Sequence, residues 1–210
     1  MLHGCAEPGE IFPDWERDFG RVAPIELEIG PGRGGFALDH ARAHPEVDLV
    51  CVETRRSDVE LIRARAAGRG LGNLAVVHGD AKLLLPRMFR TGALSAIHVQ
   101  FPDPWWKKRH HKRRMVDAEL AALLRTLLTA GGQVDFRTDV PAYAREADQT
   151  WLEAGFVRLP DAPPEVLSTR ERRYAVTGQP VFCARYENPG GGAAGRSPRS
   201  GRDWLDVRRK

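Results

Sequence analysis

The 210-residue sequence has few cysteines, no long apolar run and no signal-like start. Its three cysteines, Cys5, Cys51 and Cys183, are far apart and form no C-x-x-C pair, so neither a disulfide framework nor a cysteine zinc site is indicated. No apolar run is long enough to cross a bilayer, and the first residues lack the charged-then-apolar pattern of a secretory signal. These absences predict a cytoplasmic protein in a reducing compartment, with no membrane partner and no metal centre.

The length predicts one folded domain with short flanking segments. A hydrophobic fraction of 42% is sufficient for a full core. We expect an irregular segment at residues 1–24, the folded domain at 25–187, and a basic, disordered tail at 188–210 that is rich in Gly, Ala, Ser, Pro and Arg. The sequence leaves open whether the protein is a monomer or a homodimer.

Apolar strand-like segments alternate with helical ones along the domain. Strands are expected at Ile25–Ile29, Val47–Val52, Asn73–His78, Leu94–Gln100, Gln133–Arg137, Phe156–Leu159 and Val181–Tyr186, and helices at Gly35–His44, Ser57–Ala67, Ala118–Thr129 and Pro141–Glu153. Ser57 and Glu60 have the spacing of a capping box, and Gly131-Gly132 is expected to end the third helix. The alternation predicts an α/β protein with a doubly wound, mostly parallel sheet of seven strands.

An acidic residue stands close to the end of each of the first four predicted strands. These residues are Glu28, Glu53, Asp80 and Asp103. Ligands of open α/β sheets bind beyond the carboxyl ends of the strands. One such acid is commonplace, but four in succession predict a shared, acidic cleft.

A glycine-rich loop with Gly30, Gly32 and Gly34 follows the first strand, and glycines allow a tight turn and a close approach to a ligand. Glu53 lies 23 residues after Gly30, which is the spacing of an acid that binds ribose hydroxyls. The two features predict an adenosine-containing cofactor. Neighbouring acids would repel a pyrophosphate and attract the ammonium and sulfonium of S-adenosylmethionine. An NAD-dependent dehydrogenase is the alternative that the glycine pattern leaves open.

Positive charge is concentrated in the segment Phe101–Arg114, FPDPWWKKRHHKRR. Without the six basic and two acidic residues of 188–210, totals of 32 and 28 fall to 26 of each, and six of those 26 bases lie between Lys107 and Arg114. A neutral body with one cationic patch indicates a polyanionic partner. Two prolines stiffen the start of the segment, so Asp103 is expected to meet a nucleic-acid base there.

The motifs ELEIGPGRGGF, VCVE, VHGDA, FPDPWWKKRHHKRR and RTD, in this order, resemble the tRNA (guanine-N7)-methyltransferases over about residues 25–187. The resemblance implies a Rossmann-like class I methyltransferase with an antiparallel last strand. It also implies S-adenosyl-L-methionine as cofactor and tRNA as partner, with methylation of a guanine at position 46 of the variable loop. Ser168 stands where the family has threonine, and Arg170 replaces an aromatic residue. These two departures leave a catalytically impaired tRNA-binding homologue as an alternative.

The same resemblance implies a role for each matching residue. Asp103 would be the catalytic acid. The cofactor-binding set would be Glu28, Gly30, Gly32, Gly34, Glu53, Asp80 and Asp103. The substrate-binding set would be Lys107, Asp139, Ser168, Thr169, Arg170 and Glu171. The RNA-contacting set would be Arg109, His110, His111, Lys112, Arg113 and Arg114. From the residues alone, Asp139 could instead cap the helix that begins near Pro141, and His110 and His111 are expected to be solvated rather than metal ligands.

Overall fold

The computed structural model of the chain describes residues 12–105 and 114–190. The elements are α1 (Trp15–Phe19), β1 (Ile25–Ile29), α2 (Gly35–Ala43), β2 (Asp48–Glu53), α3 (Arg56–Gly68), β3 (Leu74–His78), α4 (Ala81–Met88), β4 (Leu94–Gln100), α5 (Ala118–Leu127), β5 (Leu128–Thr138), α6 (Pro141–Glu153), β6 (Val157–Arg158), α7 (Thr169–Thr177) and β7 (Phe182–Glu187). None of the helices among the described residues has the length and apolar character that a bilayer crossing requires.

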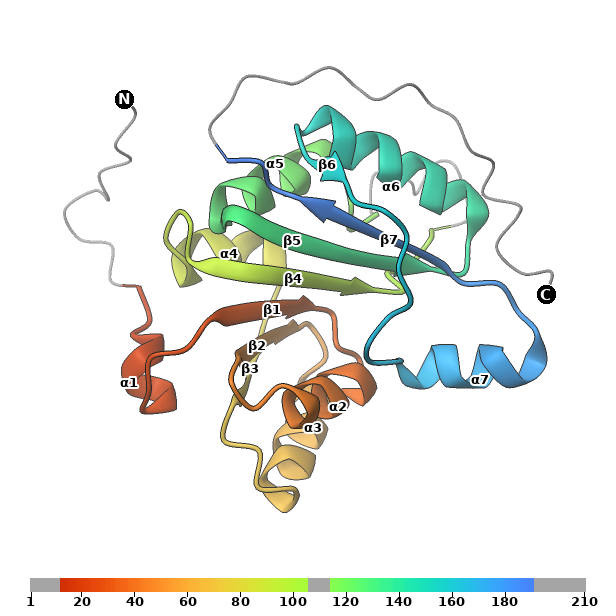
Figure 1. The fold of residues 1–210 in the computed structure, drawn as a ribbon. Coiled ribbons are helices and arrows are strands. Elements are labelled where there is room, and N and C mark those ends of the chain that lie inside the picture. Colours follow the sequence, from red (N-terminus) through yellow and green to blue (C-terminus); the bar gives the residue numbers. More distant parts are fainter. Residues whose placement is uncertain (1–11, 106–113, 191–210) are drawn as a thin grey trace.

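The seven strands form one sheet in the order β3-β2-β1-β4-β5-β7-β6 (Figure 1). Strands β1 to β5 are parallel to one another, whereas β7 runs antiparallel to both β5 and β6. The sheet therefore reverses its strand order between β1 and β4, which is a switch point of a doubly wound fold. The predicted α/β class, the seven strands and the antiparallel last strand are confirmed.

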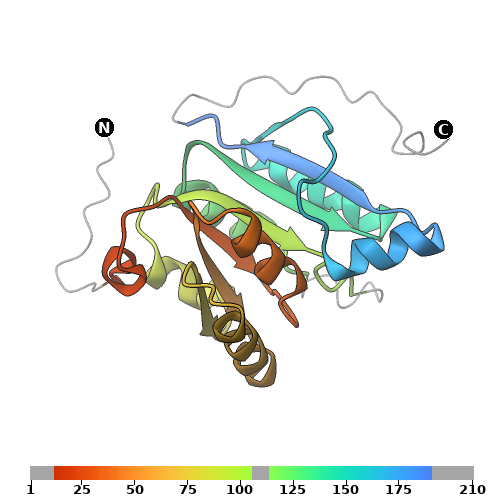
Figure 2. The same cartoon turned by 60° about the horizontal axis from the view of Figure 1, so that its bottom comes forward.

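Helices cover both faces of the sheet, with α2, α3 and α7 on one side and α4, α5 and α6 on the other (Figures 1 and 2). The larger apolar cluster joins β1, β4 and β5 to α4, α5 and α6, and Phe136 and Trp151 are among its fully buried members. A smaller cluster packs α2 and α3 on β2 and β3 through residues such as Leu49 and Ile62. Burial of these side chains is the main force that holds the layers together.

The alternation in β1, IELEI, gives the sheet one apolar and one polar face at its centre. Leu27 and Ile29 belong to the larger apolar cluster. Successive side chains of a strand point to opposite faces, so Glu26 and Glu28 lie on the α2 side. There Glu26 contacts His98 of β4. A polar layer therefore occupies the middle of the face that α2 and α7 flank.

Local structure differs from expectation at two helix ends. Helix α3 begins at Arg56 with Arg55 as its N-cap and no side-chain cap bond, so the predicted capping box at Ser57 is wrong. Helix α5 ends at Leu127, before Gly131, because the chain enters β5 there. The side-chain amide of Asn188 donates to the Leu128 carbonyl at 3.1 Å, and the backbone N–H of Asn188 donates to the Gly132 carbonyl at 2.8 Å. This tertiary pairing overrides the local helix signal.

Three helices were not expected from the sequence. Helix α1 lies in the segment expected to be irregular, and its Trp15 stacks on Phe89 at a centroid distance of 5.6 Å. Helix α4 follows β3 and is capped by Asp80, whose side chain accepts from the Lys82 backbone at 2.9 Å. Helix α7 lies between the predicted strands Phe156–Leu159 and Val181–Tyr186, where no helix was predicted. Helix α1 has only five residues, α4 contains Pro86, and α7 carries three arginines, so none of them gives a strong helix signal in the sequence.

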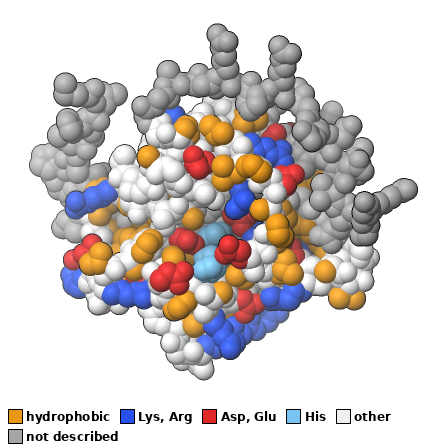
Figure 3. All heavy atoms as spheres, viewed as in Figure 1, with side chains coloured by type: hydrophobic (Ala, Val, Ile, Leu, Met, Phe, Trp, Pro, Cys, Tyr) orange, Lys and Arg blue, Asp and Glu red, His pale blue; other side chains and the backbone are white. Residues whose placement is uncertain are grey.

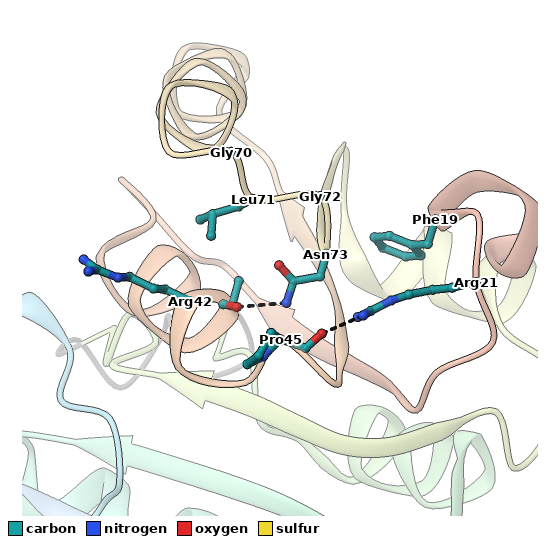
Figure 4. A pocket seen from close by; sticks show the side chains of 9 residues that line it. Phe19, Arg21, Arg42, Pro45, Gly70, Leu71, Gly72 and Asn73 are labelled. Atoms are coloured by element: carbon teal, nitrogen blue, oxygen red, sulfur yellow. Dashed lines mark hydrogen bonds between the residues drawn. The ribbon is translucent and has the colours of Figure 1, made fainter.

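A cavity of about 380 Å³ lies near the amino ends of β2 and β3. Its polar groups are already used: Asn73 donates to the Ala41 carbonyl at 2.9 Å and Arg21 to the Pro45 carbonyl at 2.6 Å (Figure 4). The cavity is at the opposite end of these strands from Glu53, which is the last residue of β2. It therefore lies at the amino edge of the sheet and is not part of the predicted cleft at the carboxyl edge.

Candidate active site at the carboxyl edge of the sheet

The carboxyl ends of the central strands lie next to one another. Ile29 of β1 pairs with Val52 of β2 and with Val99 of β4, and Gln100 of β4 pairs with Arg137 of β5. The loops that follow these strands therefore emerge along one edge, where open α/β sheets bind ligands. These loops carry the glycine-rich segment, Glu53, Asp103 and Asp139.

The glycine-rich loop and Glu53 are in direct contact. Gly30, Gly32 and Gly34 have φ values of 70°, 55° and 75°, a conformation that side chains disfavour. The Gly32 backbone N–H donates to Glu53 Oε2 at 3.0 Å, while Glu53 Oε1 accepts from the Arg55 backbone at 2.9 Å. Glu53 is only 6% exposed. The two features whose spacing predicts an adenosine site are therefore brought together at one point.

The other three acids have different environments. Glu28 is 1% exposed, its carboxylate lies 3.8 Å from the Cys51 thiol, and burial raises the pKa of Glu28 to about 7. Asp80 and Asp103 are exposed, and Asp80 also caps α4. Three of the four acids thus lie at strand ends, whereas Glu28 lies inside the polar layer of the sheet.

Asp103 lies in a strained segment that is fixed at both sides. Phe101 and Trp105 have φ values of 50° and 45°, and they are the non-glycine residues with positive φ in the described part of the chain. The Phe101 N–H donates to the Arg137 carbonyl at 2.8 Å, and the Pro104 carbonyl accepts from Arg114 Nε at 2.7 Å. Such conformations cost about 1–3 kcal/mol each and persist where the surroundings enforce them, as at functional sites.

Arg114 has a structural position. Its side chain is 7% exposed, forms an ion pair with Glu146 and lies over the Tyr143 ring, with 4.8 Å between the guanidinium carbon and the ring centre. These partners and the Pro104 carbonyl occupy its guanidinium, so in this structure Arg114 anchors the segment that carries Asp103, and its contact with RNA stays a prediction. The other predicted RNA contacts, together with Lys107, lie outside the described residues; they are Arg109, His110, His111, Lys112 and Arg113.

Helix α7 begins with a complete capping box. The Ser168 hydroxyl accepts from the Glu171 backbone at 3.2 Å, and Glu171 Oε2 accepts from the Ser168 backbone at 2.7 Å. The same Glu171 oxygen accepts from Arg137 Nη1 at 2.7 Å, and this Arg137 nitrogen also donates to the Val166 carbonyl at 2.8 Å. Ser168 and Glu171, which were predicted to bind substrate, are 6% and 4% exposed. In this structure their side chains hold α7 in place.

The remaining predicted substrate residues face the strand ends. Asp139 accepts from the Tyr174 hydroxyl at 2.6 Å and lies 3.8 Å from Arg170. The Arg170 guanidinium lies over the Phe101 ring at 5.1 Å. A Cβ added at Gly35 would come within 2.2 Å of the Thr169 hydroxyl, so α7 touches the start of α2. Asp139 does not cap α6, because the N-cap of that helix is Val140.

Two positioning residues were missed from the sequence. Arg137 is 3% exposed and bonds Asp135, Glu171 and the backbone of Val166. Tyr174 links α7 to Asp139. In the sequence, Arg137 is marked only by its place in the motif RTD. Tyr174 carries no sequence signal, because its partner Asp139 is 35 residues away.

Comparisons with known proteins identify the fold and the family. A model of the family described as "Putative methyltransferase" matches residues 22–184. A tRNA (guanine-N(7)-)-methyltransferase of Anaeromyxobacter dehalogenans is 52% identical over 184 residues, which are 84% of this chain and 92% of that protein. The chain belongs to the tRNA (guanine-N(7)-)-methyltransferase family. A second member, from Myxococcus xanthus, is 45% identical over 86% of this chain and 91% of its own length.

The fold of this tRNA (guanine-N(7)-)-methyltransferase family member is also found in solved methyltransferase structures. The crystal structure of the 16S rRNA methyltransferase KamB superposes with a TM-score of 0.63, at 19% identity, over 84% of this chain and 94% of that one. At this identity the likeness concerns the fold alone.

The glycine-rich loop of this family member offers a matched pair of substitutions. A Cβ at Gly34 would lie 2.6 Å from Ile62 Cγ1, whereas a Cβ at Gly32 would meet nothing within 4 Å. Gly32→Ala is expected to cost about 1–2 kcal/mol from backbone strain alone, and Gly34→Ala about 1–3 kcal/mol more from overpacking. Urea denaturation measures both, and equal losses would contradict the role assigned to Ile62.

Proposed function

We propose that this chain transfers the methyl group of S-adenosylmethionine to N7 of a guanine in tRNA, at position 46 of the variable loop. The carrying observation is the 52% identity to a tRNA (guanine-N(7)-)-methyltransferase over nearly the whole of both chains. The edge geometry supports it, because one set of adjacent loops carries the glycine-rich loop with Glu53 and the strained segment with Asp103. Since tRNA would be the partner, we place the activity in the cytoplasm.

The residues at the carboxyl edge fit a nucleoside cofactor with a cationic end. S-adenosylmethionine, when bound, supplies a methyl group on a positively charged sulfur. Left-handed glycines let the backbone of the loop after β1 approach a ligand closely, and Glu53 stands beside that loop with a carboxylate suited to ribose hydroxyls. Asp80 and Asp103 add exposed negative charge at neighbouring strand ends. This set would attract a cation and repel a pyrophosphate, which argues against a dinucleotide cofactor.

The chemistry at guanine N7 requires positioning more than proton transfer. N7 has a free lone pair and carries no proton, so no general base must act before it attacks. Alkylation of N7 places positive charge on the ring, and the Asp103 carboxylate can stabilise that charge while accepting hydrogen bonds from N1–H and the amino group. Stabilisation of this kind speeds the step only where it grows toward the transition state. A strained, doubly anchored backbone holds Asp103 ready for that role.

Helix α7 would form the second wall of the guanine site. Its first turn is held by Arg137 and touches α2 through Thr169. Arg170 carries a flat guanidinium above Phe101. A planar cation can stack on a ring much as an aromatic side chain does. We infer that Arg170 replaces the family's aromatic residue in this way, which favours an active enzyme over a binding-only homologue.

A methylation assay tests the proposed function. The full chain is incubated with isotope-labelled S-adenosylmethionine and tRNA, and the digested product is analysed by mass spectrometry for N7-methylguanine. A tRNA with adenine at position 46 is the matched substrate control, and NAD binding is titrated in parallel. We expect N7-methylguanine only in the guanine-46 tRNA and no NAD binding. Absence of product, methylation at another atom, or equal labelling of both tRNAs would refute the proposal.

Neutralising part of the basic run should weaken tRNA binding in a salt-dependent way. In the double variant Lys112→Ala/Arg113→Ala, two phosphate contacts are lost, so the slope of log K against log salt should become shallower by about 1.4–1.8. Filter binding at several salt concentrations measures this slope. The double variant Arg196→Ala/Arg199→Ala removes the same charge from the tail and should leave the slope unchanged. An unaltered slope in the first variant would place the RNA elsewhere.

A further inference from the structure

Two histidines converge on one carboxylate in the polar layer of the sheet. His40 of α2 has its Nε2 2.7 Å from Glu26 Oε2, and His98 of β4 has its Nε2 2.8 Å from the same oxygen. One ligand-type atom from each of the three residues lies within 4.8 Å of the others. The residues come from β1, α2 and β4, so tertiary structure alone brings them together.

The cluster is enclosed but reachable from solvent. The side chains of His40 and His98 are each 9% exposed and that of Glu26 is 15% exposed. Phe36 packs against both imidazoles, with ring centres 5.0 Å from His40 and 4.9 Å from His98. Figure 3 shows histidine atoms at the surface near the centre of this face, with acidic side chains around them.

An outer carboxylate lies beside one of the imidazoles. Asp135 Oδ2 lies 3.8 Å from His98 Nδ1, on the ring side opposite Glu26. His98 Nδ1 is buried and makes no hydrogen bond within the described part of the chain. Histidines that bind metals commonly direct the second ring nitrogen at a carboxylate, which fixes the tautomer and leaves the lone pair of the first nitrogen for the ion. Asp135 lies at that second nitrogen of His98, at a distance of 3.8 Å that is longer than a hydrogen bond.

We propose that Glu26, His40 and His98 form a binding site for one divalent metal ion of the zinc class. Two imidazoles and one carboxylate are a donor set that Zn²⁺ accepts, with a fourth position left to water. Metal–ligand distances of about 2.0–2.2 Å in a tetrahedron separate the donors by about 3.3 Å. The present contacts of 2.7 and 2.8 Å would therefore open by about half an ångström, which side-chain rotation can supply.

The ion would act as a structural link between three elements of the active-site scaffold. β1 leads into the glycine-rich loop, α2 follows that loop, and β4 leads into the segment with Asp103. No step of methyl transfer needs the ion. Its binding would stabilise the folded chain, because a ligand that prefers the native state shifts unfolding by mass action. The inference is independent of the proposed RNA substrate.

The test uses the metal-free full chain and Co²⁺ as a spectroscopic probe. We expect one equivalent of Co²⁺ to give the visible absorption of a tetrahedral site, Zn²⁺ to displace it, and Zn²⁺ to raise the thermal midpoint. Glu26→Gln and His40→Gln should each weaken Zn²⁺ binding at least tenfold. His78→Gln is the matched control, because His78 is exposed and lies near the Thr54 carbonyl, and it should bind Zn²⁺ like the wild type.

The outcomes separate a metal site from a plain hydrogen-bonded cluster. If the wild-type chain gives no tetrahedral Co²⁺ spectrum even with excess ion, the three side chains only hydrogen-bond to one another and the proposal is overturned. It is equally overturned if the cluster variants bind Zn²⁺ as tightly as the His78→Gln control. The wild-type spectrum needs no substitution, so a variant that folds poorly leaves the test intact. Glu26→Gln keeps the shape of the side chain and is the variant expected to fold best.

Discussion

Replacing Asp103 with alanine is expected to lower kcat for tRNA methylation by about a hundredfold or more, with little change in stability. Removal of one preorganised group that stabilises transition-state charge typically has an effect of this size. Asp103 is exposed, so its loss opens no cavity, and surface substitutions usually change the free energy of unfolding by less than about 0.5 kcal/mol. Steady-state kinetics with saturating tRNA and cofactor, together with a thermal melt, measure both quantities.

Asp80→Asn is the matched control for this loss of charge. Asp80 is also an exposed acid at a strand end, but it caps α4, and asparagine is an equally good N-cap. We expect Asp80→Asn to raise KM for S-adenosylmethionine while leaving kcat close to wild type. A wild-type kcat in Asp103→Ala would show that Asp103 takes no part in the chemistry. An equal fall in kcat in both variants would show that the overall negative charge of the edge matters and not the Asp103 carboxylate itself.

The sheet topology and the contact between the glycine-rich loop and Glu53 could be predicted from sequence, because both depend on local signals. Apolar strands and periodic helices alternate, so the parallel sheet follows from handedness and connection rules. The contact between Gly32 and Glu53 follows from spacing, since a βαβ unit brings the end of its second strand beside the loop after its first. Helix α6 begins at Pro141 as predicted, where proline at the first position makes the boundary visible.

The polar contacts across the sheet could not be predicted, because they join residues that are far apart in the sequence. Arg114 was grouped with its cationic neighbours, yet its environment is set by Glu146, 32 residues later. His40 and His98 carry no motif spacing: the pairing of β1 with β4 places His98 beside Glu26, and the packing of α2 on the sheet places His40 there. The sequence shows which charged side chains are present, but the tertiary packing decides which of them form ion pairs.

The capping box of α7 shows that Ser168 and Glu171 fit two roles, one as a helix cap and one as substrate-binding residues. A serine followed by glutamate three residues later is a helix-start signal as well as part of the family's substrate element. Sequence resemblance favoured the second meaning. In the structure Glu171 is 4% exposed and is shared between the Ser168 backbone and Arg137, so its carboxylate supports the helix. Thr169 and Arg170, beside it, are exposed, and their contact with a substrate stays a prediction.

Arg137 is therefore the residue on which the position of α7 depends most. It is 3% exposed and bonds Asp135 at 2.5 Å and Glu171 at 2.7 Å. Its removal would leave two carboxylates in a poorly solvated layer without their shared cation. A buried charge that loses its partner typically destabilises a protein by about 3–5 kcal/mol. The loss would also free the Val166 carbonyl and loosen the segment that leads into α7.

Arg137→Met is accordingly expected to reduce the free energy of unfolding by about 3–5 kcal/mol, which for a chain of this length lowers the thermal midpoint by about 10 °C. Urea denaturation gives the first value and calorimetry the second. Arg172→Met is the control, because Arg172 and its partner Asp39 are 48% and 35% exposed and such pairs contribute at most about 1 kcal/mol. Adding Glu171→Gln to Arg137→Met should cost less than the sum of the single changes, since the charge left unpaired is removed as well. Additive losses would show that Arg137 and Glu171 act separately and would contradict the shared role assigned to them.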